Sequence, residues 1–96
     1  MTVVAVSGYF DPIHVGHLEY FKFSKKIGTK LMVIVNNDEQ AILKKGKPFM
    51  PCDERMKIIE EFKCVDYVVK SIDTDRTVCQ TLKTVEPKPD YFCNGG

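Results

Sequence analysis

Both histidines of the 96-residue chain lie in residues 7–17, a segment that reads Ser-Gly-Tyr-Phe-Asp-Pro-Ile-His-Val-Gly-His. His14 and His17 are three residues apart, Gly16 lies between them, and Gly8 precedes them. Glycine lets a ligand or a neighbouring backbone approach closely. A helix that begins near His17 would also point its free N–H groups and the positive end of its dipole into the same space. Two imidazoles beside a helix N-terminus suit an anion, and phosphate is the ligand that we expect there.

Two other interpretations of this segment stay open. A histidine near a helix start can simply cap the helix or pack against it. His14 and His17, with Asp11 nearby, could also hold a divalent metal ion, although the glycine-rich loop favours phosphate. The segment matches neither the Gly-x-Gly-x-x-Gly fingerprint nor the Gly-x-x-x-x-Gly-Lys-Ser/Thr loop. These absences argue against a dehydrogenase and against a P-loop ATPase.

A second cluster of basic residues consists of Lys44, Lys45 and Lys47. Most lysine runs are solvated loops, and that interpretation applies here too. The alternative is a lid whose lysines reach a triphosphate or a substrate phosphate. Taken together with the two histidines, the cluster favours the lid.

Continuous apolar runs predict buried strands, and apolar residues at helical spacing predict helices. We expect strands over 2–6, 31–35, 67–69 and 91–93, and helices over 17–27 (beginning at Gly16 or His17), from Asp53 to about Phe62, and over 78–85 before Pro87. Residues 39–51 are less regular and are expected to include a mobile loop. Alternation of this kind predicts an α/β, Rossmann-like parallel sheet with helices on both faces.

In open sheets of this type the ligand lies beyond the carboxyl ends of the strands, at the point where the strand order reverses. The loop after the first strand, with its two histidines, is therefore the expected site. The aromatic residues Phe21, Phe23, Phe62 and Phe92 are expected in the core rather than as platforms for a base.

The composition is that of an ordinary globular protein, with 44% hydrophobic and 28% charged residues. We expect one domain over 1–96. The net charge of +1 gives no support for nucleic-acid binding. No apolar run approaches the roughly 20 residues needed to span a membrane, and the N-terminus lacks a basic region typical of a signal peptide. A cytoplasmic protein with no nucleic-acid or membrane partner is expected.

Four cysteines, at positions 52, 64, 79 and 93, form no Cys-x-x-Cys pair. This spacing argues against a structural zinc site and against a redox motif. Without a secretion signal, free thiols in a reducing compartment are expected.

The segment Gly8-Tyr9-Phe10-Asp11, followed by His14-Val15-Gly16-His17, resembles the Gly-x-Phe-Asp and His-x-Gly-His signature of cytidylyltransferase-like nucleotidyltransferases. That superfamily includes glycerol-3-phosphate and ethanolamine-phosphate cytidylyltransferases, heptose-phosphate adenylyltransferases and FAD synthases. Three further stretches resemble family motifs in the family's order: residues 51–55, 65–68 and 89–92. The resemblance covers essentially the whole chain.

The resemblance implies transfer of a nucleotidyl group from CTP or ATP to a small phosphorylated acceptor, with release of pyrophosphate and with Mg²⁺ accompanying the triphosphate. An acceptor phosphate oxygen would attack the α-phosphorus in line. No protein nucleophile is needed, because a phosphate monoester with a second pKa of about 6 is already largely ionised near neutral pH. Catalysis would then consist of positioning and charge stabilisation.

The resemblance also implies roles for individual residues. His14 and His17 would bind the triphosphate, held protonated by it, and stabilise charge on the α-phosphoryl group and the leaving pyrophosphate. Lys44 matches the catalytic loop lysine. Residues expected to contact the nucleotide are Gly8, Tyr9, Phe10, Asp11, Gly16, Lys63, Asn94 and Gly95, and those expected to contact the acceptor are Lys45, Lys47 and Arg55. No residue is expected to hold a metal ion directly.

Two of these assignments depart from simple carry-over. Arg55 could instead pair with an acidic residue of its own helix or support the loop. Lys63 stands where cytidylyltransferases carry arginine, and lysine keeps the charge but loses the bidentate geometry.

Relatives continue past the fourth strand, so the chain is expected to be a C-terminally truncated or minimal form. A non-catalytic nucleotide-binding module or an inactive fragment is the main alternative to an enzyme. A structural or partner-binding domain is the third. Exposed strand edges make a homodimer possible.

Overall fold

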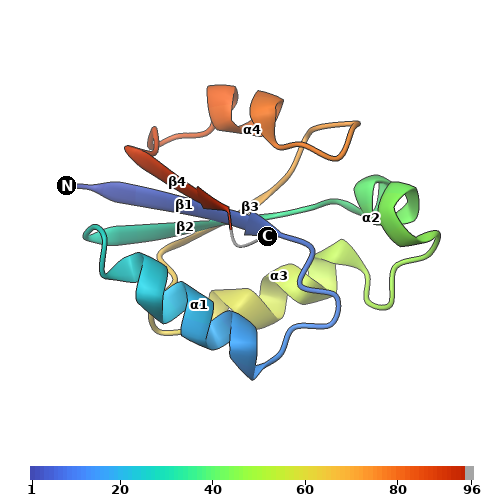
Figure 1. Ribbon diagram of the computed structural model, residues 1–96, viewed down its shortest axis with the longest axis horizontal. Helices are drawn as coiled ribbons and strands as arrows, with labels where there is room; N and C mark the ends of the chain where they lie inside the picture. The colour runs from blue at the N-terminus through green and yellow to red at the C-terminus, as the bar shows by residue number, and fades with distance from the viewer. Residues whose placement is uncertain (95–96) are drawn as a thin grey trace.

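The computed structural model describes residues 1–94, apart from the side chains of Lys45 and Asn94. Four strands form one parallel sheet in the order β3-β2-β1-β4. The elements along the chain are β1 (Val3–Gly8), α1 (Val15–Lys25), β2 (Lys30–Val35), α2 (Asp38–Lys45), α3 (Cys52–Glu60), β3 (Tyr67–Lys70), α4 (Cys79–Thr84) and β4 (Tyr91–Asn94). Figure 1 shows α4 above the sheet and α1 and α3 below it. The predicted α/β parallel sheet with helices on both faces is confirmed.

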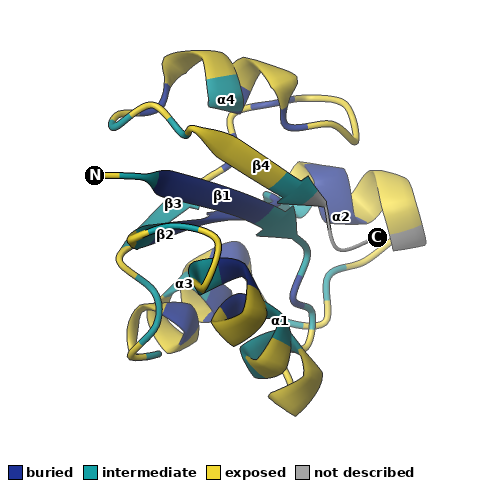
Figure 2. Ribbon diagram, turned by 60° about the vertical axis from the view of Figure 1, so that its left-hand side comes forward, coloured by how far each residue is buried: buried dark blue, intermediate teal, exposed yellow. Residues whose placement is uncertain are grey.

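The two central strands are buried on both faces, which explains their continuous apolar sequences. Residues 3–6 of β1 and 31–35 of β2 are all at most 1% exposed. Figure 2 shows the ribbon of β1 coloured as buried over most of its length. Alternate side chains of these strands enter two separate cores. The core between the sheet and helices α1 and α3 includes Val6, Leu31, Val33, Val35, Phe21 and Ile59. The core between the sheet and α4 includes Val3, Ala5, Met32, Ile34, Val78 and Val85.

All four predicted strands and all three predicted helices are confirmed, with ends that differ from the predicted ones by no more than two residues. The main difference is α2, which forms where the sequence predicted an irregular segment with a mobile loop. Asn37 caps this helix, and the side chain of Gln40 closes a reciprocal capping box. Gly46, in the left-handed region at φ 87°, ends it. Good local end signals therefore fix a helix whose apolar periodicity is weak.

Two of the four phenylalanines expected in the core are exposed. Phe21 is fully buried and Phe62 packs against the core, as predicted. Phe23 is 70% exposed, because it lies two residues from Phe21 and so on the solvent face of α1. Phe92 is 41% exposed on the edge strand β4. The core prediction is wrong for Phe23 and Phe92.

All four cysteines are free thiols, with Cys52 buried and Cys79 exposed. Over residues 1–94, no helix combines the length and the apolar character needed to cross a membrane.

Candidate functional site

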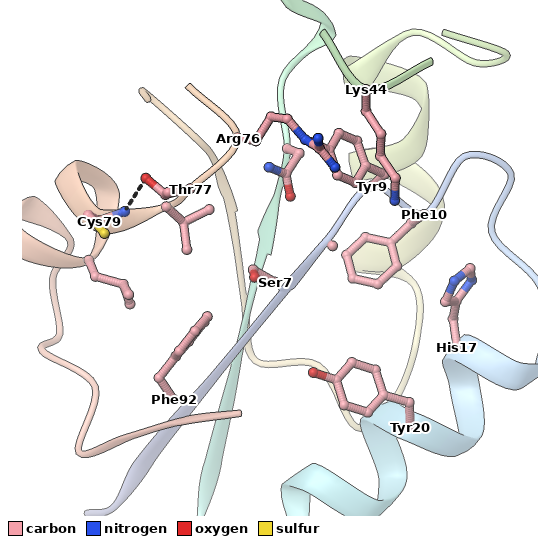
Figure 3. Close-up of a pocket in the computed structure, with 14 residues that line it drawn as sticks. Ser7, Tyr9, Phe10, His17, Tyr20, Lys44, Arg76, Thr77, Cys79 and Phe92 are labelled. Carbon is pink, nitrogen blue, oxygen red and sulfur yellow. Dashed lines mark hydrogen bonds between the residues drawn. The ribbon is translucent and has the colours of Figure 1, made fainter. Parts of the chain in front are cut away.

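A pocket of about 450 Å³ opens at the carboxyl end of β1 (Figure 3). Its walls come from the β1–α1 loop, α1, α2, the β3–α4 loop with α4, and β4. The lining residues are Ser7, Gly8, Tyr9, Phe10, His17, Tyr20, Asn36, Lys44, Arg76, Thr77, Val78, Cys79, Leu82 and Phe92. The place is where an open parallel sheet binds its ligand, beside the strand at which the chain order reverses.

The charged groups in this pocket are basic. Lys44 and Arg76 line it together with His17, and none of its described lining residues carries a carboxylate. A concave surface with charge of one sign concentrates ligands of the opposite sign. The pocket therefore suits an anion.

His14 and His17 form the N-terminal cap of α1. The Nδ1 of His14 accepts a hydrogen bond from the backbone N–H of Gly16 at 3.0 Å. The Nδ1 of His17 accepts one from the backbone N–H of His14 at 3.1 Å. The two rings stack, with centroids 3.9 Å apart and planes inclined by 26°. The interpretation that these histidines cap the helix is therefore correct. The cap uses only the Nδ1 atoms, so the Nε2 atoms of both rings take no part in it.

This geometry selects one form of each imidazole. Because both Nδ1 atoms accept hydrogen bonds, a neutral ring carries its hydrogen on Nε2. Burial, followed by the charge of His14 beside it, lowers the pKa of His17 below its usual value of 6.5. In the free protein the lowered pKa favours the neutral form of His17, with its hydrogen on Nε2, whereas the expectation of protonated rings concerned the state with a triphosphate bound. A proton on Nδ1 would break the cap.

Two glycines are required here by close contacts. A Cβ at Gly16 would lie 2.8 Å from Cε1 of His14, and a Cβ at Gly8 would lie 2.7 Å from the ring of Phe10. Phe10 itself has φ 52°, a region that a bulky residue rarely adopts. Its buried ring packs edge-on against His17, with centroids 5.0 Å apart. The loop therefore fixes the ring of His17 at the pocket wall.

Asp11 joins two loops of the site. Its carboxylate accepts hydrogen bonds from the backbone N–H of Phe49 at 2.7 Å and of Met50 at 2.6 Å. This holds the segment between α2 and α3 against the β1–α1 loop. Over residues 1–94, excluding the two side chains not described, no group of three or more His, Cys, Asp or Glu side chains could hold a metal ion, so His14, His17 and Asp11 do not form a metal centre in this conformation.

The basic cluster is only partly brought to the pocket. The Nζ of Lys44 lies 4.4 Å from the centroid of the Tyr9 ring, a cation–π distance, and both residues line the pocket. Lys47 is exposed in the segment after α2 and is not a lining residue. The side chain of Lys45 is not described. Asn94 pairs with Ser7 through its backbone, its side chain is not described, and Gly95 lies outside the described residues.

Arg55 is fully buried and supports the loops from behind. Its Nε donates to the carbonyl oxygen of Met50 at 2.9 Å, and its Nη1 donates to those of Tyr9 and Asn36. Its Nη2 lies 2.9 Å from a carboxylate oxygen of Asp38. The expected contact with an acceptor phosphate is wrong, because every nitrogen of the guanidinium already has a partner inside the protein. The acidic partner comes from α2 rather than from the helix that carries Arg55.

Lys63 is exposed at the turn that precedes β3. In a parallel sheet the amino ends of the strands lie at the edge opposite the carboxyl ends, and the pocket lies at the carboxyl ends. Lys63 is not among the residues that line this pocket, and its nucleotide contact stays a prediction.

The β3–α4 loop was missed by the sequence analysis. It brings Arg76 and Thr77 into the pocket wall. The signal available in the sequence is an arginine among polar residues shortly after the strand at 67–69, at the same sheet edge as the histidines. Ser7, Tyr20, Asn36 and Cys79 are further lining residues that were not singled out.

The comparisons with known proteins agree with this geometry. A sequence profile described as Cytidylyltransferase-like matches residues 5–96. The chain is 36% identical over 87 residues to the FAD synthase of Methanocorpusculum labreanum, covering 91% of this chain and 60% of that protein. It is 36% identical over 96 residues to the bifunctional protein HldE of Blochmanniella floridana, covering 98% of this chain and 19% of that protein.

A solved structure of the lipopolysaccharide core biosynthesis protein from Thermoplasma volcanium superposes with a TM-score of 0.85 at 34% identity. The match covers 96% of this chain and 72% of that one. The chain thus spans about 60% of the FAD synthase and a fifth of HldE, while the family profile covers nearly all of the chain. Together with the histidine cap and the basic pocket at the reversal point of the sheet, these matches show that the chain belongs to the Cytidylyltransferase-like family.

Proposed function

We propose that this chain transfers a nucleotidyl group from ATP or CTP to a small phosphorylated acceptor and releases pyrophosphate. The observation that carries the proposal is the pair of imidazoles at the start of α1, whose Nδ1 atoms accept backbone N–H groups so that Nε2 is left to donate. They stand beside a pocket whose described lining is basic and free of carboxylates. Family membership supports the same reaction class.

The described residues suit a reaction that needs no protein nucleophile. The Nε2 sides of the two imidazoles supply neutral donors for triphosphate oxygens. Lys44 adds a full positive charge at the Tyr9 wall. Donors held in place before the reaction stabilise charge that grows on the α-phosphoryl group and on the leaving pyrophosphate, and one such donor is worth roughly 3–4 kcal/mol.

ATP is the first nucleotide to test. One relative is named FAD synthase, and FAD contains an adenine nucleotide. CTP is the second, because the family profile carries the name Cytidylyltransferase-like.

The proposed Mg²⁺ ion would be held mainly by the triphosphate and water. Mg²⁺ takes oxygen ligands, and the described pocket lining supplies no carboxylate for it. When bound, the ion offsets negative charge on the phosphates.

The test is release of pyrophosphate from ATP or CTP in the presence of Mg²⁺ and a panel of phosphorylated alcohols, sugars and flavin precursors. The proposal predicts release that depends on an acceptor and is lost in His14→Ala and His17→Ala. Lys83→Ala, on the exposed side of α4, is the control and should behave as wild type. Binding of a triphosphate without turnover would support a nucleotide-binding module instead. Absence of triphosphate binding would contradict both.

A further inference from the structure

The loop between β3 and α4 is held by α2 through side-chain hydrogen bonds. The Nδ2 of Asn37 donates to the carbonyl oxygens of Ser71 and Asp73, at 3.0 and 2.9 Å. The Nε2 of Gln40 donates to those of Asp75 and Thr77, at 2.7 and 2.8 Å. Gln40 is fully buried, so these bonds are shielded from water. The loop is therefore fixed to the N-terminal end of α2, and Lys44 projects from the C-terminal end of the same helix.

This arrangement presents the guanidinium of Arg76 to the pocket. Figure 3 shows Arg76 and Lys44 both at the Tyr9 end of the pocket, whereas His17 comes from α1. Because the loop is clamped at four carbonyls, the backbone that carries Arg76 loses little freedom when a ligand binds.

The acidic neighbours of Arg76 are engaged within the loop and α4. The carboxylate of Asp75 accepts from the N–H and the hydroxyl of Thr77, at 2.9 and 2.6 Å. That of Asp73 accepts from the backbone N–H groups of Gln80 and Thr81. Among the described ion pairs none involves Arg76. A permanently charged guanidinium with five donors in a fixed fork suits the oxygens of a phosphate group.

The chemistry of an in-line transfer divides the pocket into two sides. An acceptor phosphate oxygen forms a new bond to the α-phosphorus, while the bond from the α-phosphorus to the oxygen bridging to the β-phosphorus breaks. The electron pair of that bond leaves with pyrophosphate. The entering phosphate must therefore lie opposite the leaving group. We call the side of the pocket at the start of α1, with His14 and His17, the histidine wall. If the histidine wall holds the triphosphate, the opposite side, made by α2 and the β3–α4 loop, faces the entering phosphate.

We propose that Arg76, with Lys44 beside it, binds the phosphate of the acceptor and so determines specificity for phosphorylated acceptors. This inference rests on the proposed nucleotidyl transfer. It adds a second phosphate site, on a loop that lies far from the histidine motif in the sequence and is held by α2.

The test uses inorganic phosphate as the probe for the acceptor phosphate. The full chain is titrated with phosphate, with and without saturating Mg²⁺ and α,β-methylene-ATP, and the Nε–H resonance of Arg76 is followed by NMR. Phosphate should shift this resonance while the analogue occupies the histidine wall. Arg76→Met should weaken phosphate binding to the analogue complex by roughly tenfold or more, as expected for loss of a charge-assisted contact. Arg76→Lys should restore part of the affinity, and Lys83→Met should have no effect.

The affinity for the analogue should change less than about twofold in Arg76→Met. Wild-type phosphate affinity in Arg76→Met, or no phosphate binding by the wild-type complex, would overturn the role of Arg76. A loss of analogue affinity equal to the loss of phosphate affinity would do the same, because Arg76 would then serve the nucleotide. The proposed function fails by a different result, namely analogue binding that is absent or independent of His14 and His17.

Discussion

Helices α1 and α2 begin with the same reciprocal capping box built from different residues. In α2, Asn37 Oδ1 accepts from the N–H of Gln40, and Gln40 Oε1 accepts from the N–H of Asn37, both at 2.9 Å. In α1 the Nδ1 atoms of His14 and His17 take the corresponding places. Both boxes have the same structural role, because each provides hydrogen-bond acceptors for backbone N–H groups that have no partner at the start of a helix.

The difference lies in where the remaining donors point. The side-chain NH₂ groups of Asn37 and Gln40, which the box does not use, donate to four carbonyl oxygens of the β3–α4 loop. The spare Nε2–H groups of the two imidazoles have no acceptor among the described residues, and His17 lines the pocket. One box thus fastens the protein to itself, and the other keeps two donors for a ligand. Exchanging the residues of a box should separate capping from these second roles.

The largest effect is expected from the double substitution His14→Asn with His17→Gln, which gives α1 the residue types of the α2 box. Both new side chains can still cap, so the free energy of unfolding should change by less than about 1 kcal/mol. The two Nε2–H donors are lost, and pyrophosphate release should fall by about a thousandfold or more. Steady-state kinetics and urea unfolding on the same sample measure the two quantities. Retained turnover would show that capping is the whole function of the histidines.

The second effect concerns Arg55, which ties both loops to α2. Arg55→Met leaves the carbonyl oxygens of Met50, Tyr9 and Asn36 without their donor. The free energy of unfolding should fall by about 3–5 kcal/mol. Arg76→Met is the matched control, because Arg76 is exposed and should cost less than about 0.5 kcal/mol. Equal losses in the two variants would contradict the support role of Arg55.

The third effect tests the α2 box. Gln40→Met removes the donor to Asp75 and Thr77 and should lower the free energy of unfolding by about 2–3 kcal/mol. It should also weaken phosphate binding through Arg76 more than binding of α,β-methylene-ATP, because the loop that presents Arg76 is released. Gln80→Met, at an exposed position of α4, is the control. A purely structural Gln40 would lower stability and leave the ratio of the two affinities unchanged.

The smallest effect is the pH dependence that His17 contributes. Its pKa is lowered in the folded protein, so the unfolded chain takes up the proton first as the pH falls. The stability from this group is complete above pH about 6.5 and is lost as the pH falls through the folded-state pKa. Urea unfolding of the wild type and of His17→Gln at pH 7.5 and 5.5 should show a larger loss for the wild type. Parallel losses would mean that the pKa of His17 is not lowered.

The fold could be predicted well because its strands are continuous apolar runs. Val3–Val6 and Leu31–Val35 could be read only as buried strands, and their order placed the histidine loop at the carboxyl edge. Helix α2 was missed although its Asn-x-x-Gln box and its terminal Gly46 were both in the sequence. The weak apolar pattern of residues 38–45 outweighed these end signals, which turned out to decide the structure.

Only the part of the site that lies in one short segment of sequence, the histidine loop, was predicted. The histidine pair could be found because three residues of one loop carry the signal. The two arginines could not be assigned, since Arg55 is defined by partners 17 and 46 residues away and Arg76 by a loop that α2 holds. Both are charged residues that a linear pattern would place on the surface. Only the tertiary contacts distinguish Arg55, which is buried and supports the loops, from Arg76, which lines the pocket.

The central claim is that the Nε2–H groups of His14 and His17 hold the polyphosphate. The most direct measurement is the imidazole ¹⁵N–¹H NMR spectrum of the full chain, recorded before and after addition of Mg²⁺ and α,β-methylene-ATP. The account predicts that both free rings carry their hydrogen on Nε2, with Nδ1 unprotonated, and that both Nε2–H resonances move when the analogue binds. A hydrogen on Nδ1 in the free protein, or Nε2–H resonances that do not move on saturation, would contradict it.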